Sequence, residues 1–102
     1  MTKKKQDEPT GKGLFDRELT IRNKLGIHAR PAALFVKTAA KFDAEILVEK
    51  DGMKVSGKSI MGLLTLEGYQ GAVIKITAEG SDAGEALDAL QDLVEEKLFY
   101  ED

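Results

Sequence analysis

The segment "NKLGIHARPA" (residues 23–32) contains the only histidine of the chain, followed two residues later by an arginine and three residues later by a proline. Because Pro31 is tolerated in the first turn of a helix, a helix beginning near His28 would place the imidazole beside unpaired backbone N–H groups. The positive end of that helix disfavours an imidazolium and stabilises an anion carried by the ring. Arg30 can add charge-assisted hydrogen bonds to phosphate oxygens. His28, Arg30 and Pro31 therefore have the chemistry that a phosphoryl acceptor requires.

Other interpretations of the same histidine stay open. A lone histidine at a helix start is often only a cap or a surface residue. A small-molecule hydrolase using His28 as a base is a further alternative, although the sequence places no nucleophile or orienting third group beside it. A histidine-rich metal site is excluded because the chain has no second histidine and no cysteine, and we predict no metal and no cofactor.

Composition indicates a soluble protein of the cytoplasm. The chain has 102 residues and a formal net charge of −3, which fits one globular domain. Acidic and basic residues are mixed along the sequence, so no concentrated basic face is expected for nucleic acid. No run approaches the roughly 18 apolar residues of a membrane span. We predict a flexible N-terminal tail over residues 1–13 and a single domain over residues 14–102. The tail is not expected to be a signal peptide, because no apolar stretch follows Lys3 to Lys5.

Hydrophobic periodicity predicts the elements of the first half of the chain. Alternating polar and apolar residues from Phe15 indicate a strand. From Ala32, apolar residues recur at i, i+3, i+4 and i+7, which predicts a helix that ends near Asp43. Residues 45–50 and 53–57 then form two strands around Asp51-Gly52, a dipeptide typical of tight hairpin turns.

The second half is predicted in the same way. Residues 59–67 form a short helix, and residues 69–80 form a strand with alternate apolar residues on one face. A last helix follows Asp82, which has capping-box spacing to Glu85. The order β-α-β-β-α-β-α indicates an α+β domain, and the helical crossovers by themselves favour a small mixed sheet with helices on one face.

Two motifs carry a resemblance to a known family. The segments "GIHARPA" (residues 26–32) and "GKSIMGLLTL" (residues 57–66), in this order, resemble HPr, the histidine-containing phosphocarrier of the bacterial phosphoenolpyruvate–sugar phosphotransferase system. The likeness runs from about Leu19 to the last helix. It implies an open-faced β-sandwich, in which a four-stranded antiparallel sheet is covered on one face by three helices.

The resemblance also implies a function for the histidine segment. His28 would accept a phosphoryl group on Nδ1 from phosphorylated enzyme I and pass it to an enzyme IIA domain. Arg30 matches the arginine that balances charge on the phosphate, and Pro31 matches the proline beside the site. Such a protein is a carrier and not an enzyme with its own turnover, and we expect it to be a monomer.

The second motif implies regulation and docking. Ser59 matches a serine that HPr kinase/phosphorylase modifies in some bacteria, and it also suits the N-cap of the short helix. Ile60, Met61 and Leu64 match the surface on which partners dock. We expect Ile60 and Met61 to face outward, and Leu63 and Leu66 to face inward.

The resemblance leaves two related functions open. One is a nitrogen-branch relative of HPr with a regulatory role and no part in sugar transport. The other is an interaction protein switched by Ser59. The long N-terminal tail, Tyr69 and the final "LFYED" depart from the family pattern, but none of them touches the histidine motif.

Overall fold

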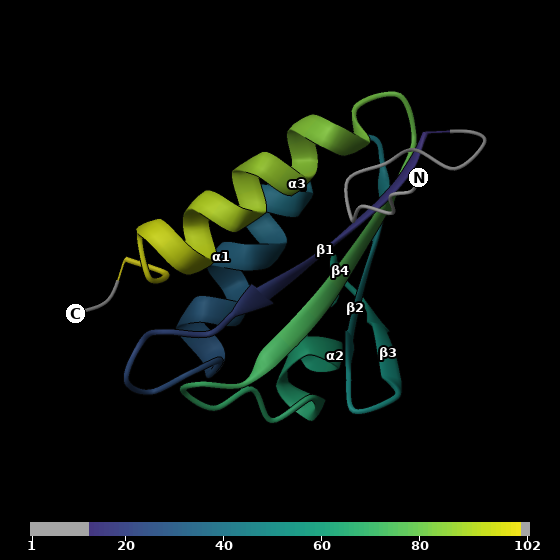
Figure 1. Ribbon diagram of the computed structural model, residues 1–102. Coiled ribbons are helices and arrows are strands. Elements are labelled where there is room, and N and C mark those ends of the chain that lie inside the picture. Colours follow the sequence, from purple (N-terminus) through teal and green to yellow (C-terminus); the bar gives the residue numbers. More distant parts are fainter. Residues whose placement is uncertain (1–12, 101–102) are drawn as a thin grey trace, which may run out of the picture.

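A four-stranded antiparallel sheet forms one layer of the protein (Figure 1). The computed structural model describes residues 13–100. The sheet has the order β1-β4-β2-β3, and its strands are β1 (Leu14–Thr20), β2 (Glu45–Lys50), β3 (Met53–Ser56) and β4 (Val73–Glu79). Apart from Gly13, the predicted N-terminal tail lies outside the described residues.

The positions of the strands explain why the sheet is not mixed. β1 and β2 run in the same direction because each pairs antiparallel with β4, which lies between them. In the same way, β3 and β4 each pair antiparallel with β2. Each helical crossover therefore joins parallel strands, but these strands are not neighbours. The mixed sheet expected from periodicity is wrong, and the antiparallel sheet implied by the resemblance is confirmed.

Helices cover one face of the sheet (Figure 1). They are α1 (Ala29–Ala39), α2 (Ile60–Thr65) and α3 (Ala83–Gln91), and α3 continues into the π-helical turn η1 (Asp92–Glu96). The three predicted helices are confirmed, although the last one changes its hydrogen-bond pattern after Gln91. No helix in the described part of the chain is long and apolar enough to cross a membrane.

The core lies between the sheet and the helices. On β4 and just before it, the side chains predicted to share one face are all buried, namely Ala72, Ile74, Ile76 and Ala78. They pack in one cluster with Phe35 of α1, Leu63 of α2, and Leu87 and Leu90 of α3. The period-two and period-3.6 patterns therefore bury their apolar faces against each other.

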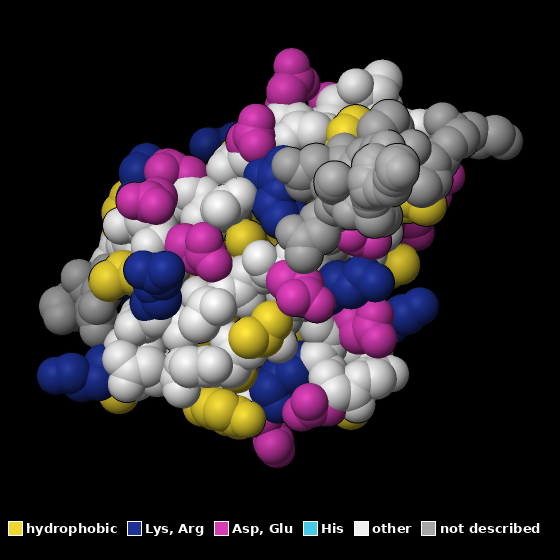
Figure 2. Space-filling model, in the orientation of Figure 1, with side chains coloured by type: hydrophobic (Ala, Val, Ile, Leu, Met, Phe, Trp, Pro, Cys, Tyr) yellow, Lys and Arg dark blue, Asp and Glu magenta, His cyan; other side chains and the backbone are white. Residues whose placement is uncertain are grey.

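The opposite face of the sheet is charged. The strand register places Glu18, Lys75, Glu49 and Lys54 in one row across all four strands, so that acidic and basic residues alternate. Figure 2 shows the two kinds of charged side chain intermingled on this side of the molecule. Cross-strand pairs of opposite charge stabilise a sheet face that remains in water.

Two predicted turns have different outcomes. The hairpin at Asp51-Gly52 is confirmed, and both residues have the positive φ that this tight turn requires, 53° and 85°. The capping box at Asp82 is wrong, because the Asp82 side chain caps no amide of α3. Its two carboxylate oxygens instead accept the N–H groups of Asp43 and Ala44, each at 2.9 Å. The carboxylate satisfies amides at the approach to β2 and ties α3 to that strand.

Candidate functional site

The loop between β1 and α1 is held by a second loop, which joins α2 to β4. The N–H of Ile27 donates to the carbonyl oxygen of Gly68 at 2.7 Å. The N–H of Ile21 donates to Ala72, and its carbonyl oxygen accepts the N–H of Gly71. Ile21 and Ile27 are also buried. The backbone just before His28 is therefore fixed from both ends by contacts to residues far along the chain.

His28 is the N-cap residue of α1. Its backbone is extended (φ −115°, ψ −164°), and its carbonyl oxygen accepts the N–H of Ala32 at 2.9 Å, which begins the helix. Its side chain forms no capping hydrogen bond with the helix, and the residue is exposed. The imidazole therefore lies in solvent beside the end of α1 where backbone N–H groups lack intrahelical acceptors.

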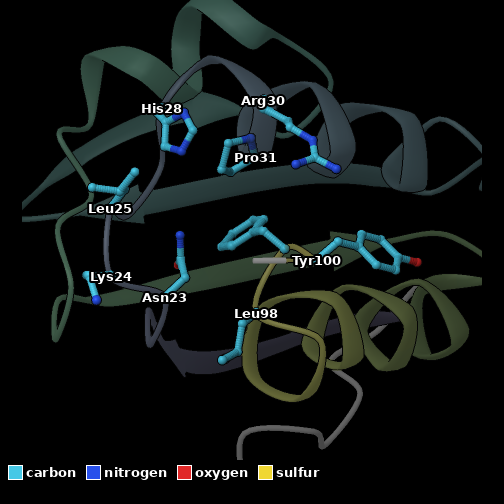
Figure 3. Close-up of a pocket in the computed structure, with 9 residues that line it drawn as sticks. Asn23, Lys24, Leu25, His28, Arg30, Pro31, Leu98 and Tyr100 are labelled. Carbon is cyan, nitrogen blue, oxygen red and sulfur yellow. The ribbon is translucent and has the colours of Figure 1, made fainter. Parts of the chain in front are cut away.

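Pro31 and Arg30 occupy the first turn of α1, as predicted. Pro31 is buried, and its ring suits a position whose N–H would have no intrahelical partner. Arg30 is exposed. In Figure 3 its guanidinium group extends away from the imidazole of His28, on the other side of Pro31 and toward Tyr100. The structure thus brings all three residues to one site, but the guanidinium does not face the ring.

A pocket of about 170 Å³ opens beside His28. Its polar wall is made by side chains from the loop and the first turn of α1, namely Asn23, Lys24, His28 and Arg30. Its apolar wall is made by Leu25, Pro31, Leu98, Phe99 and Tyr100 (Figure 3). Residues from the two ends of the domain therefore meet at the histidine.

Sequence reasoning missed the role of residues 98–100. The only signal was an apolar, aromatic run after the last helix. Leu98, Phe99 and Tyr100 all have left-handed backbones, with φ of 50°, 54° and 54°. Such conformations cost about 1–2 kcal/mol per residue outside glycine, so other contacts must hold them.

Phe99 supplies that hold. Its side chain is only 2% exposed and belongs to the core cluster, and its N–H donates to the carbonyl oxygen of Leu93 at 2.7 Å. Beside it, Lys97 Nζ lies 3.2 Å from Asp92 Oδ2 and 5.6 Å from the centre of the Tyr100 ring. The hydrogen bond with Asp92 raises the pKa of Lys97. The C-terminal segment is therefore fixed against the domain, with Tyr100 at the pocket.

Asn23 is a buried polar residue of the pocket wall, 3% exposed. Its Nδ2 donates to the carbonyl oxygen of Gly26 at 2.8 Å. Among the described residues, Oδ1 has no hydrogen-bond partner. Sequence reasoning counted Asn23 only as a turn residue, because its partner and its burial depend on the folded loop.

The residues of the second motif lie on α2, outside the pocket. The Oγ of Ser59 accepts the N–H of Gly62 at 3.0 Å, which confirms that Ser59 caps α2. Ile60 and Met61 are exposed, 41% and 72%, as predicted. Leu64 is half-buried and packs against the core, whereas Leu63 and Leu66 are buried. α1 and α2 pack against each other, so this surface adjoins the helix that His28 begins.

The described residues offer no evident place for a metal ion, since no three His, Cys, Asp or Glu side chains come together among residues 13–100.

A family model described as "PTS HPr component phosphorylation site" matches residues 15–96, a range that includes the histidine loop and all strands but the first residue of β1. The chain belongs to the HPr family. The matched range includes His28, whose exposed side chain lies at the N-cap of α1. The match therefore confirms the family predicted from the two motifs. HPr proteins are phosphocarriers of the phosphotransferase system.

Individual HPr relatives are similar to this chain over most of its length. The chain is 44% identical to the HPr-like protein Crh of Halalkalibacterium halodurans over 84 residues, which are 82% of this chain and all of the relative. It is 43% identical to the phosphocarrier protein HPr of Neisseria meningitidis over 81 residues, covering 79% of this chain and 91% of the relative.

Solved HPr structures share the fold. A crystal structure of HPr from Thermoanaerobacter tengcongensis superposes with a TM-score of 0.80 at 54% identity, covering 85% of this chain and 97% of that one. HPr from the same organism has also been solved as a dimer. The expectation that this chain is a monomer therefore stays a prediction.

Proposed function

We propose that this chain carries a phosphoryl group on His28 within the phosphotransferase system, taking it from phosphorylated enzyme I and passing it to an enzyme IIA domain. The observation that carries the proposal is the exposed imidazole at the N-cap of α1, with no capping hydrogen bond to hold it, inside a family match that is named for a phosphorylation site. The ring is accessible to two partners in turn, as a carrier requires.

The transfer step forms one bond and breaks one. The lone pair of His28 Nδ1 attacks phosphorus, and the P–N bond of the donor breaks with its electron pair remaining on the donor nitrogen. Nε2 of His28 keeps its proton. Backbone N–H groups at the start of α1 and the positive end of that helix would stabilise the phosphoryl oxygens. The reverse step at the acceptor uses the same geometry.

Arg30 would bind the phosphoryl group by turning its side chain toward the ring. Arg30 is an exposed residue, and in the turned position its guanidinium could form two hydrogen bonds to phosphate oxygens. Buried Pro31 would keep the first turn of α1 rigid and so fix the position from which both His28 and Arg30 extend.

The partner surface would extend from His28 over α2. Ile60 and Met61 are large exposed apolar residues on a helix that packs beside α1, and Leu64 would contribute its exposed part. Contacts of this kind suit small, transient interfaces, because a carrier must dissociate after each transfer. We place these exchanges in the cytoplasm.

The test is phosphorylation with purified components. Incubation with phosphoenolpyruvate and enzyme I should add one phosphate that is labile in acid and stable in base, and His28→Ala should remove it. A label that survives in His28→Ala would contradict the assignment. Arg30→Ala should slow transfer while the protein stays folded, and an unchanged rate would remove the role of Arg30. Parallel reactions with a nitrogen-branch enzyme I homologue distinguish the two pathways, because the donor of the chain's own pathway should phosphorylate it faster.

Regulation through Ser59 is a second proposed function, favoured by the position of its hydroxyl at the N-cap of α2 and by the likeness to Crh. A phosphate there would meet the positive end of the helix. ATP and HPr kinase/phosphorylase should give an acid-stable phosphate that Ser59→Ala lacks. If binding to a regulator is the main output, His28→Ala should keep that affinity and Ser59→Ala should lose the switch.

A further inference from the structure

The pocket beside His28 exposes two large apolar side chains that the proposed transfer step does not use. Leu25 is 74% exposed at the tip of the loop, and Tyr100 is 51% exposed at the end of the described chain. Figure 3 shows Leu25 next to His28 and Tyr100 on the far side of the pocket, beyond Pro31. Large apolar residues gathered around a reactive group indicate a surface that a partner covers.

The C-terminal wall of the pocket consists of Leu98, Phe99 and Tyr100. Leu98 and Tyr100, on either side of the buried Phe99, both line the pocket. The chain brings Tyr100 to this place through three successive left-handed residues, which the contacts of Phe99 hold. The family match ends at residue 96, so this wall lies beyond the part of the chain that the family model describes. It is a place where this chain can differ from other HPr proteins.

Any protein that exchanges a phosphoryl group with His28 must bring its own reacting residue to the imidazole. Because His28 lines the pocket, the side chains around that reacting residue must lie over it. The polar wall formed by the histidine and the start of α1 would face the phosphoryl group. The wall formed by Leu25, Leu98 and Tyr100 would face an uncharged side chain.

We propose that the pocket receives an apolar side chain of enzyme I next to its phosphorylated histidine, and that Leu25 and Tyr100 are specificity-determining residues for this transfer. The inference rests on the proposed phosphocarrier function. A few well-packed side chains near the centre of an interface carry most of its binding energy. This pocket would therefore set the affinity for the donor, while the imidazole carries out the chemistry.

Steady-state phosphorylation by enzyme I tests the proposal. Leu25→Ala and Tyr100→Ala should each raise KM at least about fivefold, the loss expected when a side chain that contributes measurably to an interface is truncated, with little change in kcat. Tyr100→Phe should keep the wild-type KM because the contact is apolar.

Two matched controls remove exposed apolar side chains outside the pocket. Tyr69→Ala removes an exposed tyrosine whose ring also lies near a lysine, with Lys50 Nζ at 4.9 Å from the ring centre. Val73→Ala removes an exposed apolar residue of β4. Both should leave KM unchanged, and thermal unfolding should show that all variants are folded.

The outcomes separate this inference from the proposed function. If enzyme I fails to phosphorylate the wild-type protein, the phosphocarrier function is wrong. If phosphorylation occurs but Leu25→Ala and Tyr100→Ala keep the wild-type KM, the pocket inference is overturned. Amide NMR shifts at residues 25 and 98–100 should change on titration of the His28→Ala variant with enzyme I. Shifts that change on dilution of the protein alone would show that a second copy occupies the pocket, and would also overturn it.

Discussion

Asn23 closes the turn that leads to His28 by two hydrogen bonds to Gly26. Its side-chain Nδ2 donates to the Gly26 carbonyl oxygen at 2.8 Å, and its backbone carbonyl oxygen accepts the Gly26 N–H at 3.2 Å. The Gly26 carbonyl lies two residues before the histidine. The position of the imidazole therefore depends on one buried amide side chain.

We predict that Asn23→Ala weakens both the fold and phosphotransfer. Loss of the buried donor leaves the Gly26 carbonyl unsatisfied and should cost about 1–3 kcal/mol of unfolding free energy. Transfer should also slow because the loop before His28 loses the side-chain hydrogen bond that closes its turn. Urea denaturation and the rate of phosphorylation by enzyme I measure the two effects. Gln70→Ala, which removes an exposed side-chain hydrogen bond to Arg22 in the facing loop, should change little. Equal effects in the two variants would refute the bracing role of Asn23.

Gly26→Ala should damage the same loop by a different route. Gly26 has φ of +69°, and an added Cβ would overlap the carbonyl oxygen of Gly68, which accepts the N–H of Ile27. A strained left-handed residue costs about 1–3 kcal/mol, and separating the two loops adds to this. Thermal unfolding should show a clearly lower Tm and the variant should be a poor phosphoryl acceptor.

A second alanine substitution provides the control for Gly26→Ala. Gly84 lies inside α3, and a Cβ built there meets nothing within 4 Å. Gly84→Ala should stabilise the protein by about 0.5–1 kcal/mol because alanine loses less backbone entropy in a helix. Destabilisation by both variants would mean that the loop contact is not the cause.

Ser59→Ala should lower stability by about 1 kcal/mol, since the Gly62 N–H loses the acceptor that caps α2. Ser59→Asp should restore the stability because aspartate is an equally good N-cap. The measurement is the midpoint of thermal unfolding for the three proteins. If Ser59→Ala is as stable as wild type, the cap contributes nothing and a purely regulatory role for Ser59 would gain weight.

Asp82→Ala should destabilise the protein without changing phosphotransfer. The Asp82 carboxylate accepts hydrogen bonds from two backbone N–H groups that precede β2. A hydrogen bond to a charged group contributes about 1.5–3 kcal/mol to the free energy of unfolding. Asp88→Ala breaks an exposed ion pair with Arg17 and should cost at most about 1 kcal/mol. Denaturant unfolding compares the two, and a smaller loss in Asp82→Ala than in Asp88→Ala would contradict the prediction.

Much of the site could be predicted from the sequence because it depends on local rules. A proline in a first turn and apolar residues at helical spacing place the start of α1 within a residue of His28. Ser59 is recognised as a cap because a cap and its amide lie three residues apart. Asp51-Gly52 is recognised because the turn conformation restricts the residues that can occupy it.

Other features depend on contacts between distant segments. The insertion of β4 between β1 and β2 decides that the sheet is antiparallel, and no local pattern records the order of strands. Asp82 has the spacing of a capping box, yet its carboxylate satisfies amides 38 and 39 residues away. Propensity for a cap is weaker than the requirement that amides near the core find acceptors.

The amino-acid sequence by itself determined the family, the elements and the identity of the phosphoacceptor candidate, because each of these follows from residue types at short, regular spacings. Only the tertiary structure decided what surrounds the imidazole. Leu25, Asn23 and Tyr100 meet at one pocket because burial of Phe99 carries the C-terminal segment back to the histidine loop. That gain in buried apolar surface is a property of the whole core, and no single segment of the chain encodes it.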